Sequence, residues 1–426
     1  MRRSRLATLA AAVAVCAGAG GFLALAPDAQ AATTSRIPAH VFAPYFEAYA
    51  GGSMSSLAQQ SGDKFLTMAF VQTPSVGSCT AYWNGNTGQP ISSSTYGADI
   101  TAIRNSGGDV IPSFGGYAAD NGGTELADSC SSVSSIAGQF ENMITTYDVT
   151  RIDLDVEDNS LNRTDGIDRR NKAIKQVEDW AAASGRLIQF SYTLPTTTGG
   201  LAQSGLAVLQ NAVSNGARID VVNMMTFDYY DGAAHNMATD TQTSANGLIN
   251  QLRALYPSKT TTQLWGTVGI TEMIGIDDFG AAETFSLANA TTVTNWAKAQ
   301  GIASLSFWAL QRDNGGCPGG SAADNCSGVA QSTWQFSHTM QTFTSGGSST
   351  TPPTTPPTTT PTTKPPTTPP TTPPTTQPGT TAWAPYTAYT VGQIVTYNGK
   401  LYQCRQSHTS LPGWEPPNVL ALWLPL

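Results

Sequence analysis

The stretch RIDLDVED, residues 151–158, is the part of the sequence that says most about the fold. Acidic residues occupy every second position, at Asp153, Asp155 and Glu157, and aliphatic residues fill the positions between them. A period of two is the period of a β-strand, so the acids project from one face and the aliphatic side chains from the other. Carboxylates held this close together cannot all ionise easily, so one of them keeps its proton near neutral pH. A general acid needs that protonated state.

Two non-catalytic interpretations of this row are an exposed edge strand and a structural cation site that also uses Asp158. An edge strand does not need aliphatic residues packed on its other face. Hard cations are usually held by ligands on loops rather than within a strand. The pattern therefore favours a buried strand that carries catalytic acids.

Eight β-type segments can be read along the large N-terminal part of the chain, and stretches with helical spacing, such as 168–185 and 248–256, lie between them. Eight such units in about 300 residues are the count of a (β/α)8 TIM barrel, an α/β fold, which we predict for residues 34–344. Glu157 then lies at the C-terminal end of the fourth strand, where barrels of this kind place catalytic groups. The predicted strands are 40–46, 64–71, 108–114, 150–157, 187–194, 219–227, 264–271 and 303–309.

Further candidate site residues lie at the same ends of other predicted strands. Ser113 and Gly116 follow the third strand, Asp228 and Tyr229 follow the sixth, and Trp308 lies in the eighth. An ordinary turn at Ser113 to Gly116 and a core position for Trp308 are the structural alternatives. Together these residues predict one pocket at the C-terminal end of the barrel.

The two ends of the chain differ from the barrel. Residues 1–31 combine a basic start, an apolar run and a small-residue cleavage site, which predicts a cleaved signal peptide and a secreted protein with no membrane anchor. Residues 345–381 are almost entirely Thr and Pro, which predicts an extended linker of on the order of 100 Å. Residues 382–426 then form a second, small folded domain rich in aromatic residues.

Composition limits the partners and cofactors. A charged fraction of 12% and a net charge of -8 argue against nucleic acid as a partner, because binding it requires a concentrated basic surface. The four His form no zinc-type motif, so neither a metal nor another cofactor is expected. Cys317 could pair with Cys326 and Cys79 with Cys130, which leaves Cys404 over, although other pairings stay open.

These motifs together resemble glycoside hydrolase family 18, the chitinases, and in particular the branch of bacterial chitinase D. The DxxDxDxE motif of the family is matched at Asp153, Asp155 and Glu157, and SxGG is matched at 113–116. MxYD is matched in part, at Met225 and Asp228. Two positions depart from the family: Thr150 replaces the first Asp of DxxDxDxE, and Phe227 replaces the Tyr of MxYD.

The resemblance implies a mechanism in which the N-acetyl group of the substrate is the nucleophile. Glu157 would protonate the glycosidic oxygen, Asp155 would stabilise and orient the oxazolinium ion, and Asp153 would tune the charge of Asp155. Among the substrate-binding residues, Asp228 would contact the distorted sugar and Trp308 would form an apolar floor beneath it. The others expected at the site are Ser113, Gly116, Met225 and Tyr229, where Tyr229 or Tyr230 would supply the hydroxyl that Phe227 lacks.

The order AWxxYxxYxxGxxVxYNGxxYxC, with a late Trp, resembles the chitin-binding modules of carbohydrate-binding families 5 and 12. By this resemblance Trp383, Tyr397 and Trp423 belong to the core of the small domain. Trp414 is the candidate for a ring that stacks on a sugar, and the alternative is that it closes the core.

The sequence therefore predicts a secreted, monomeric, endo-type chitinase that cleaves β-1,4 linkages of chitin and chitooligosaccharides with retention. A short connection between the seventh and eighth strands predicts a shallow, open groove. The alternatives are a non-catalytic chitin-binding or lectin-like protein on the same barrel, and an endo-N-acetylglucosaminidase acting on glycoprotein glycans.

Overall fold

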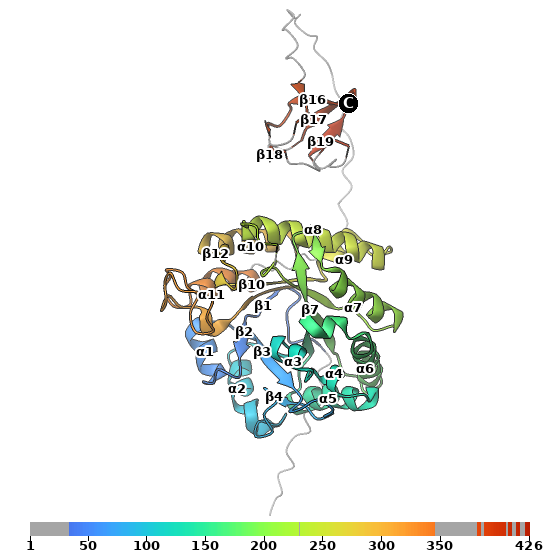
Figure 1. Ribbon diagram of the computed structural model, residues 1–426, viewed down its shortest axis with the longest axis vertical. Coiled ribbons are helices and arrows are strands. Elements are labelled where there is room, and N and C mark those ends of the chain that lie inside the picture. The colour runs from blue at the N-terminus through green and yellow to red at the C-terminus, as the bar shows by residue number, and fades with distance from the viewer. Residues whose placement is uncertain are drawn as a thin grey trace, which may run out of the picture. The chain divides into compact units, whose positions relative to one another are not determined.

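A computed structural model describes residues 34–229, 231–345, 381–384, 387–405, 408–410, 415–417 and 422–426 of the protein. The chain divides into two compact units, residues 1–350 and 351–426 (Figure 1). This division falls inside the Thr/Pro-rich segment. The finer limits of signal peptide, barrel, linker and module remain predictions.

Parallel strands build the first unit, in the order β1-β13-β10-β9-β7-β6-β5-β3-β2. Strands β1 and β2 are consecutive pieces of one segment; β1 pairs with β13 and β2 pairs with β3, so the sheet closes on itself. The described strands therefore occupy eight positions around a barrel, and the predicted (β/α)8 fold is confirmed. Their bounds are β1 Val41–Phe42, β2 Tyr45–Glu47, β3 Phe65–Gln72, β5 Asp109–Gly115, β6 Arg151–Asp155, β7 Gln189–Thr197, β9 Val221–Met225, β10 Val268–Met273 and β13 Ser304–Trp308.

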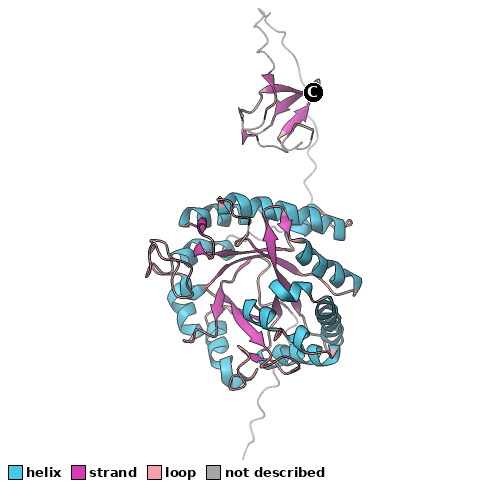
Figure 2. Ribbon diagram, in the orientation of Figure 1, coloured by secondary structure: helices cyan, strands magenta, loops and turns pink. Residues whose placement is uncertain are grey.

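Helices surround the strands on the outside of the barrel (Figure 2). The longer ones are α1 Met54–Ser61, α2 Ser93–Asn105, α5 Val133–Tyr147, α6 Thr164–Ala183, α7 Gln203–Ser214, α8 Met237–Leu255 and α10 Leu287–Gln300. The shorter ones are α3 Tyr117–Gly122, α4 Leu126–Ser129, η1 Asp158–Asn162, α9 Thr261–Trp265, η2 Leu310–Arg312, α11 Gln335–Met340 and α12 Thr342–Ser345. Strands outside the barrel positions are β4 Tyr82–Trp83, β8 Gly200–Leu201 and the β11 Gly275–Asp277 and β12 Gly280–Phe285 hairpin.

Strand β6 has the two faces that its sequence predicts. Ile152 and Leu154 are fully buried in the main hydrophobic core together with residues of the surrounding helices. Asp153 lies opposite Ser113 of β5 and Ser191 of β7 in the parallel register. Because side chains in register point to the same face, the acids project into the barrel.

The seventh predicted strand, 264–271, is wrong at its start, because β10 begins only at Val268. Leu264 and Trp265 belong to helix α9 instead. A capping box explains the difference: the Thr260 side chain accepts from the backbone N–H of Gln263, and the Gln263 side chain accepts from that of Thr260.

Two disulfides link Cys79 to Cys130 and Cys317 to Cys326, as the sequence suggested. The first joins the loop after β3 to the end of α4. Among the described residues, no helix is both long enough and apolar enough to cross a membrane.

The second unit contains a small sheet in the order β14-β16-β17-β19 and a strand pair β15-β18. Trp423 is fully buried in its core, and the partly buried rings of Trp383 and Tyr397 pack against that core. Trp383 and Tyr397 meet each other edge to face, with ring centroids 5.5 Å apart. The core positions implied for these rings therefore agree with the structure. Trp414 lies outside the described residues. The strand bounds are β14 Thr381–Ala382, β15 Ala388–Tyr389, β16 Ile394–Tyr397, β17 Lys400–Cys404, β18 His408–Thr409 and β19 Trp423–Pro425.

Candidate active site

Asp153 is the innermost acid of the row, and four hydroxyl groups surround it. Its Oδ2 accepts from Ser113 Oγ at 2.7 Å and from Tyr45 Oη at 3.0 Å. Its Oδ1 accepts from Ser191 Oγ at 2.6 Å and from Thr193 Oγ1 at 2.7 Å. Burial raises the pKa of Asp153, and the four hydrogen bonds oppose that rise. The set of donors therefore supports a charged carboxylate in the interior of the barrel.

Asp155 ends strand β6 and lies one step nearer to the mouth of the barrel. Burial raises its pKa well above the ordinary value, and the charges of Glu157, Asp153 and Asp120 raise it further. Asp155 Oδ1 is buried and accepts no hydrogen bond from the described residues. Burial and neighbouring acids therefore both disfavour the charged form of Asp155.

Glu157 follows β6 and is partly exposed to solvent. Burial raises the pKa of Glu157 to about 7, with a hydrogen bond from the backbone of Tyr117 acting against the rise and the charge of Asp158 adding to it. A pKa near the working pH suits a group that must give up a proton and later recover it. The row thus consists of an acid held by four hydroxyl donors, an acid whose pKa is raised well above its ordinary value, and an acid whose pKa is raised to about 7, in that order toward the mouth.

The predicted residue Ser113 lies within this network and not on a substrate surface. It is fully buried, and its hydroxyl donates to Asp153. We therefore reassign Ser113 from substrate binding to support of Asp153.

Aromatic rings line one side of the site. The partly exposed ring of Trp308 stacks on Phe70 with centroids 5.5 Å apart and an angle of 10° between the planes. Tyr45 packs against Trp308 at 5.7 Å. Gly116 makes room for this arrangement, since an added Cβ would lie 2.5 Å from the ring of Phe70. Gly116 was predicted to bind substrate. In the structure it leaves room for the ring of Phe70, which in turn stacks on Trp308.

A second acidic cluster lies at the end of β9. Asp228 has a positive φ of 50°, and burial together with Asp277, Asp278 and Glu283 raises its pKa to about 7. One carboxylate oxygen from each of Asp228, Asp277 and Glu283 lies within 4.8 Å of the others, a spacing that could hold a hard cation. Protonation of Asp228 and Asp277, whose pKa is also raised to about 7, is the other way to relieve the repulsion.

Met225 is the last residue of β9 and lies in register with Thr271 of β10, so it faces the barrel interior below Asp228. Phe227 packs against the main core. Tyr229 is buried, its ring lies 4.9 Å from that of His235, and its backbone N–H donates to Glu283. The backbone contact joins Tyr229 to the cluster of Asp228 and Glu283 rather than to the row on β6, and its role in substrate binding stays a prediction. Tyr230, the other candidate for the missing hydroxyl, is not among the described residues.

Thr150 precedes β6, at the opposite end of the barrel from Glu157. Its hydroxyl accepts from the backbone N–H of Arg36 at 3.3 Å. Three residues of strand, about 10 Å, separate it from Asp153. The replacement of the first Asp of the motif therefore lies away from the acids that it was expected to influence.

Several site residues were missed in the sequence. Tyr45, Thr193 and Asn223 form one hydrogen-bonded group, in which Asn223 Nδ2 donates to Thr193 Oγ1 at 2.9 Å and to Tyr45 Oη at 3.3 Å. Ser191 and Thr193 alternate along the fifth predicted strand, so extending the period of two to that strand would have found them. Asp120 was missed as well: its Oδ2 accepts the backbone N–H of Glu157 at 2.5 Å. No periodic signal marks Asp120, because it lies on the short helix α3.

A parallel barrel with a row of acids at the C-terminal end of one strand and an aromatic floor beside it defines a glycoside hydrolase. The family model for glycosyl hydrolases family 18 matches residues 41–284, more than half of the chain. The chain therefore belongs to glycosyl hydrolases family 18. Residues 382–424 match carbohydrate-binding module family 5/12.

Relatives agree with this assignment. The chain is 31% identical over 293 residues to a probable bifunctional chitinase/lysozyme of Escherichia coli, covering 66% of this chain and 32% of that protein. It is 31% identical over 288 residues to endochitinase 11 of Metarhizium anisopliae, covering 65% of this chain and 53% of the relative. The chain thus spans about a third to a half of the length of these relatives.

A solved structure of active domain 2 of the thermostable chitinase from Pyrococcus furiosus, in complex with chito-oligosaccharides, is similar to the barrel. The sequence identity is 29% and the TM-score is 0.65, over 75% of this chain and 100% of that chain.

Proposed function

We propose that this protein is a secreted endo-type chitinase that hydrolyses β-1,4 linkages between N-acetylglucosamine units of chitin with retention. The observation that carries the proposal is the graded acid row, in which Asp153 is held by four hydroxyl donors, the pKa of Asp155 is raised well above its ordinary value, and the pKa of Glu157 is raised to about 7. Family membership and the chitinases among its relatives support chitin as the substrate.

In the proposed mechanism, Glu157 donates its proton to the glycosidic oxygen as the bond to the anomeric carbon breaks. The carbonyl oxygen of the substrate's own acetamido group forms the new bond to that carbon, which gives an oxazolinium ion. Asp155 accepts a hydrogen bond from the acetamido N–H and stabilises the positive charge, and charged Asp153 behind it offsets that charge further. Glu157, now a carboxylate, takes a proton from the water that opens the ring and is restored.

The proposed binding surface uses both sides of the barrel mouth. Trp308, backed by Phe70, offers an apolar face on which a sugar ring can stack. Asp228 provides a hydrogen-bonding carboxyl on the other side, and its neighbour Met225 lines the wall. Trp414 of the module remains our candidate for a further stacking ring. In this proposal no cofactor takes part, and the protein acts as a monomer.

The second unit is proposed to attach the enzyme to solid chitin. The match to carbohydrate-binding module family 5/12 supports this role. A Thr/Pro-rich linker at 345–381 would let the barrel reach many chains around one anchoring point, and tethering raises the local enzyme concentration at the polymer surface. Residues 1–31 would direct secretion and be removed.

The proposal is tested by incubating the secreted protein and a Glu157→Gln variant with colloidal chitin. We expect soluble sugar from the first and a loss of about 10²- to 10⁴-fold in the second, as for removal of a general acid. Glu272→Gln is the matched control, since Glu272 is also a buried acid with a raised pKa but is hydrogen-bonded to Thr241 of the outer helix α8. If neither the wild type nor the Glu157→Gln variant releases soluble sugar, the proposal is refuted.

A further inference from the structure

Asp120 makes the closest contact to the catalytic end of β6 from outside that strand. It lies on helix α3, directly after the SxGG motif, and is fully buried. Its Oδ2 accepts the backbone N–H of Glu157 at 2.5 Å. The next residue, Asn121, accepts at its Oδ1 from Asn159 Nδ2 at 2.7 Å. Two successive residues of α3 therefore hold the segment that carries the general acid.

Asp120 reaches this position because β5 ends in a glycine. A Cβ added to Gly115 would lie 2.0 Å from the backbone oxygen of Asp155 and 3.5 Å from Asp120 Oδ1. A side chain at Gly115 would thus separate β5 from β6 and crowd the carboxyl of Asp120. Asp120 Oδ1 is buried and accepts no hydrogen bond from the described residues.

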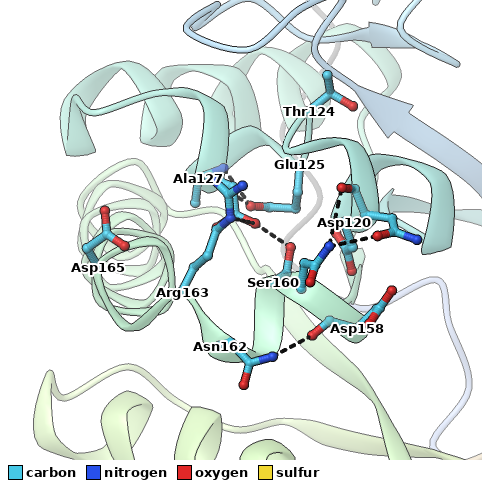
Figure 3. A network of polar contacts seen from close by, with 12 residues as sticks. Asp120, Thr124, Glu125, Ala127, Asp158, Ser160, Asn162, Arg163 and Asp165 are labelled. Carbon is cyan, nitrogen blue, oxygen red and sulfur yellow. Dashed lines mark hydrogen bonds and ion pairs between the residues drawn. The ribbon is translucent and has the colours of Figure 1, made fainter.

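The surroundings of Asp120 are mostly acidic. Its burial raises its pKa well above the ordinary value, the charges of Glu125 and Glu157 add to this effect, and Arg170 opposes it. Glu125 forms a buried ion pair with Arg170 at 2.7 Å, which partly cancels its charge. Figure 3 shows Asp120 beside the turn η1 with Asp158 and Ser160, and Glu125 on the segment leading into α4. The acids that face Asp120 without a cation of their own are therefore Asp155 and Glu157, with Asp158 facing Glu157 from η1.

We propose that Asp120 is a positioning residue of the active site, which fixes the backbone of Glu157. This inference rests on the proposed function, because it assigns Asp120 a role in the same reaction. By holding the Glu157 N–H, Asp120 fixes the direction in which the Glu157 side chain leaves β6. Two substitutions, one without and one with an oxygen at this position, test whether Asp120 acts through this hydrogen bond.

The two substitutions differ in whether an oxygen remains to accept the Glu157 N–H. Asp120→Ala removes the acceptor, and we expect kcat on a soluble chitooligosaccharide to fall by about tenfold or more with KM nearly unchanged. Asp120→Asn keeps an oxygen that can accept the Glu157 N–H, so kcat should stay within about threefold of the wild type.

The matched control is Asp128→Asn. Asp128 is a buried acid of the same region and accepts from Ser160, but it makes no contact with Glu157 among the described interactions. We expect Asp128→Asn to lower the melting temperature and to leave kcat within about threefold of the wild type. Wild-type kcat in folded Asp120→Ala, or a loss of kcat in Asp120→Asn as large as that in Asp120→Ala, would overturn the inference.

A second measurement does not depend on turnover. Carbon-13 labelling of the side-chain carboxyls of the eight glutamates lets the signal of Glu157 be followed by NMR, with Glu157→Gln used to assign it. We expect this signal to shift or broaden in Asp120→Ala, because the backbone of Glu157 is no longer held, and to keep its position in Asp120→Asn and Asp128→Asn. An unchanged signal in Asp120→Ala would refute the anchoring role. If the wild-type protein does not cleave chitin, the proposed function fails, and this signal still decides the role of Asp120.

Discussion

The two acidic clusters at the mouth of the barrel are built in opposite ways. The row on β6 contains Asp153, whose carboxylate accepts from four side-chain hydroxyls of β2, β5 and β7. In the β9 cluster the described donors to Asp277 and Glu283 are backbone N–H groups, those of Phe279 and Tyr229. The four hydroxyl donors favour the charged form of Asp153 and oppose the effect of its burial. In the β9 cluster, the pKa values of Asp228 and Asp277 are raised to about 7, so protonation or a bound cation must relieve the repulsion between the acids.

The largest effect expected within this comparison is a loss of activity on substitution of Asp155, which tests whether the acids of the β6 row have different roles in catalysis. Asp155→Asn replaces the carboxyl that would face the oxazolinium ion with an amide that cannot become anionic, and we expect kcat on chitooligosaccharides to fall by about 10²- to 10³-fold, as for the loss of one preorganised transition-state contact. Steady-state kinetics give the answer. Asp277→Asn in the second cluster is the matched control, and an equal loss there would erase the distinction between the clusters.

The pH profile tests the intermediate pKa of Glu157. Its acid form is the active form, so kcat/KM should be constant below the pKa and fall by about tenfold per pH unit above it, with the limb near pH 7. Initial rates between pH 4 and 9 on a soluble substrate measure this limb. A basic limb near pH 4 to 5 would show that Glu157 has an ordinary carboxyl pKa and that the graded row is wrong.

The hydroxyl donors are tested through stability. Ser191→Ala removes one of the four hydrogen bonds to a buried carboxylate, and we expect the free energy of unfolding to fall by about 1.5–3 kcal/mol. Urea unfolding followed by circular dichroism measures it. Ser184→Ala, which removes an exposed hydroxyl from the end of α6, should change it by less than about 0.5 kcal/mol. Equal effects would mean that the hydroxyls do not specifically support Asp153.

The smallest effect concerns the second cluster. Asp277 has a pKa of about 7 in the folded protein and 3.8 ordinarily, so the folded state binds its proton more tightly. Its contribution to stability is complete below about pH 4 and is lost as the pH rises through about 7. In Asp277→Asn, the melting temperature should therefore fall less between pH 5 and 8 than in the wild type, by about 2–4 °C.

The exposed neighbour Asp278 provides the control for that measurement, because Asp278→Asn should leave most of the pH dependence in place. If the melting temperature of Asp277→Asn depends on pH as that of the wild type does, then the repulsion between the acids of the cluster is relieved in another way, such as by a bound cation.

Periodic features of the sequence predicted the barrel and its acid row correctly. The period of two in β6 specifies which residues face inward, and the order of strand and helix segments specifies the closed sheet. The start of β10 was missed because local capping at Thr260 and Gln263 outweighs the β-type character of Leu264 and Trp265. The loops were harder still: the buried position of Tyr229 depends on Glu283 and His235, which lie 54 and 6 residues further along the chain.

Asp120 illustrates the limit most clearly. Nothing in its local sequence distinguishes it from a solvated helix residue, because its role depends on contact with Glu157, 37 residues away. The same holds for Ser113 and Gly116, which the family motif identified but whose contacts are with Asp153 and Phe70. The family motif identifies residues near the site, whereas their contacts are known only from the structure.

The Cys79–Cys130 disulfide has a consequence for how the protein must be produced. The bridge closes a segment of 51 residues that includes β5, Gly116 and Asp120. Cross-linking a segment of this length lowers the entropy of the unfolded chain, which raises the free energy of unfolding by about 4 kcal/mol. Since small domains are stable by only about 5–15 kcal/mol, a reducing cytoplasm would remove a large share of that margin. The redox state of the compartment in which the chain folds therefore helps to decide whether this side of the barrel assembles.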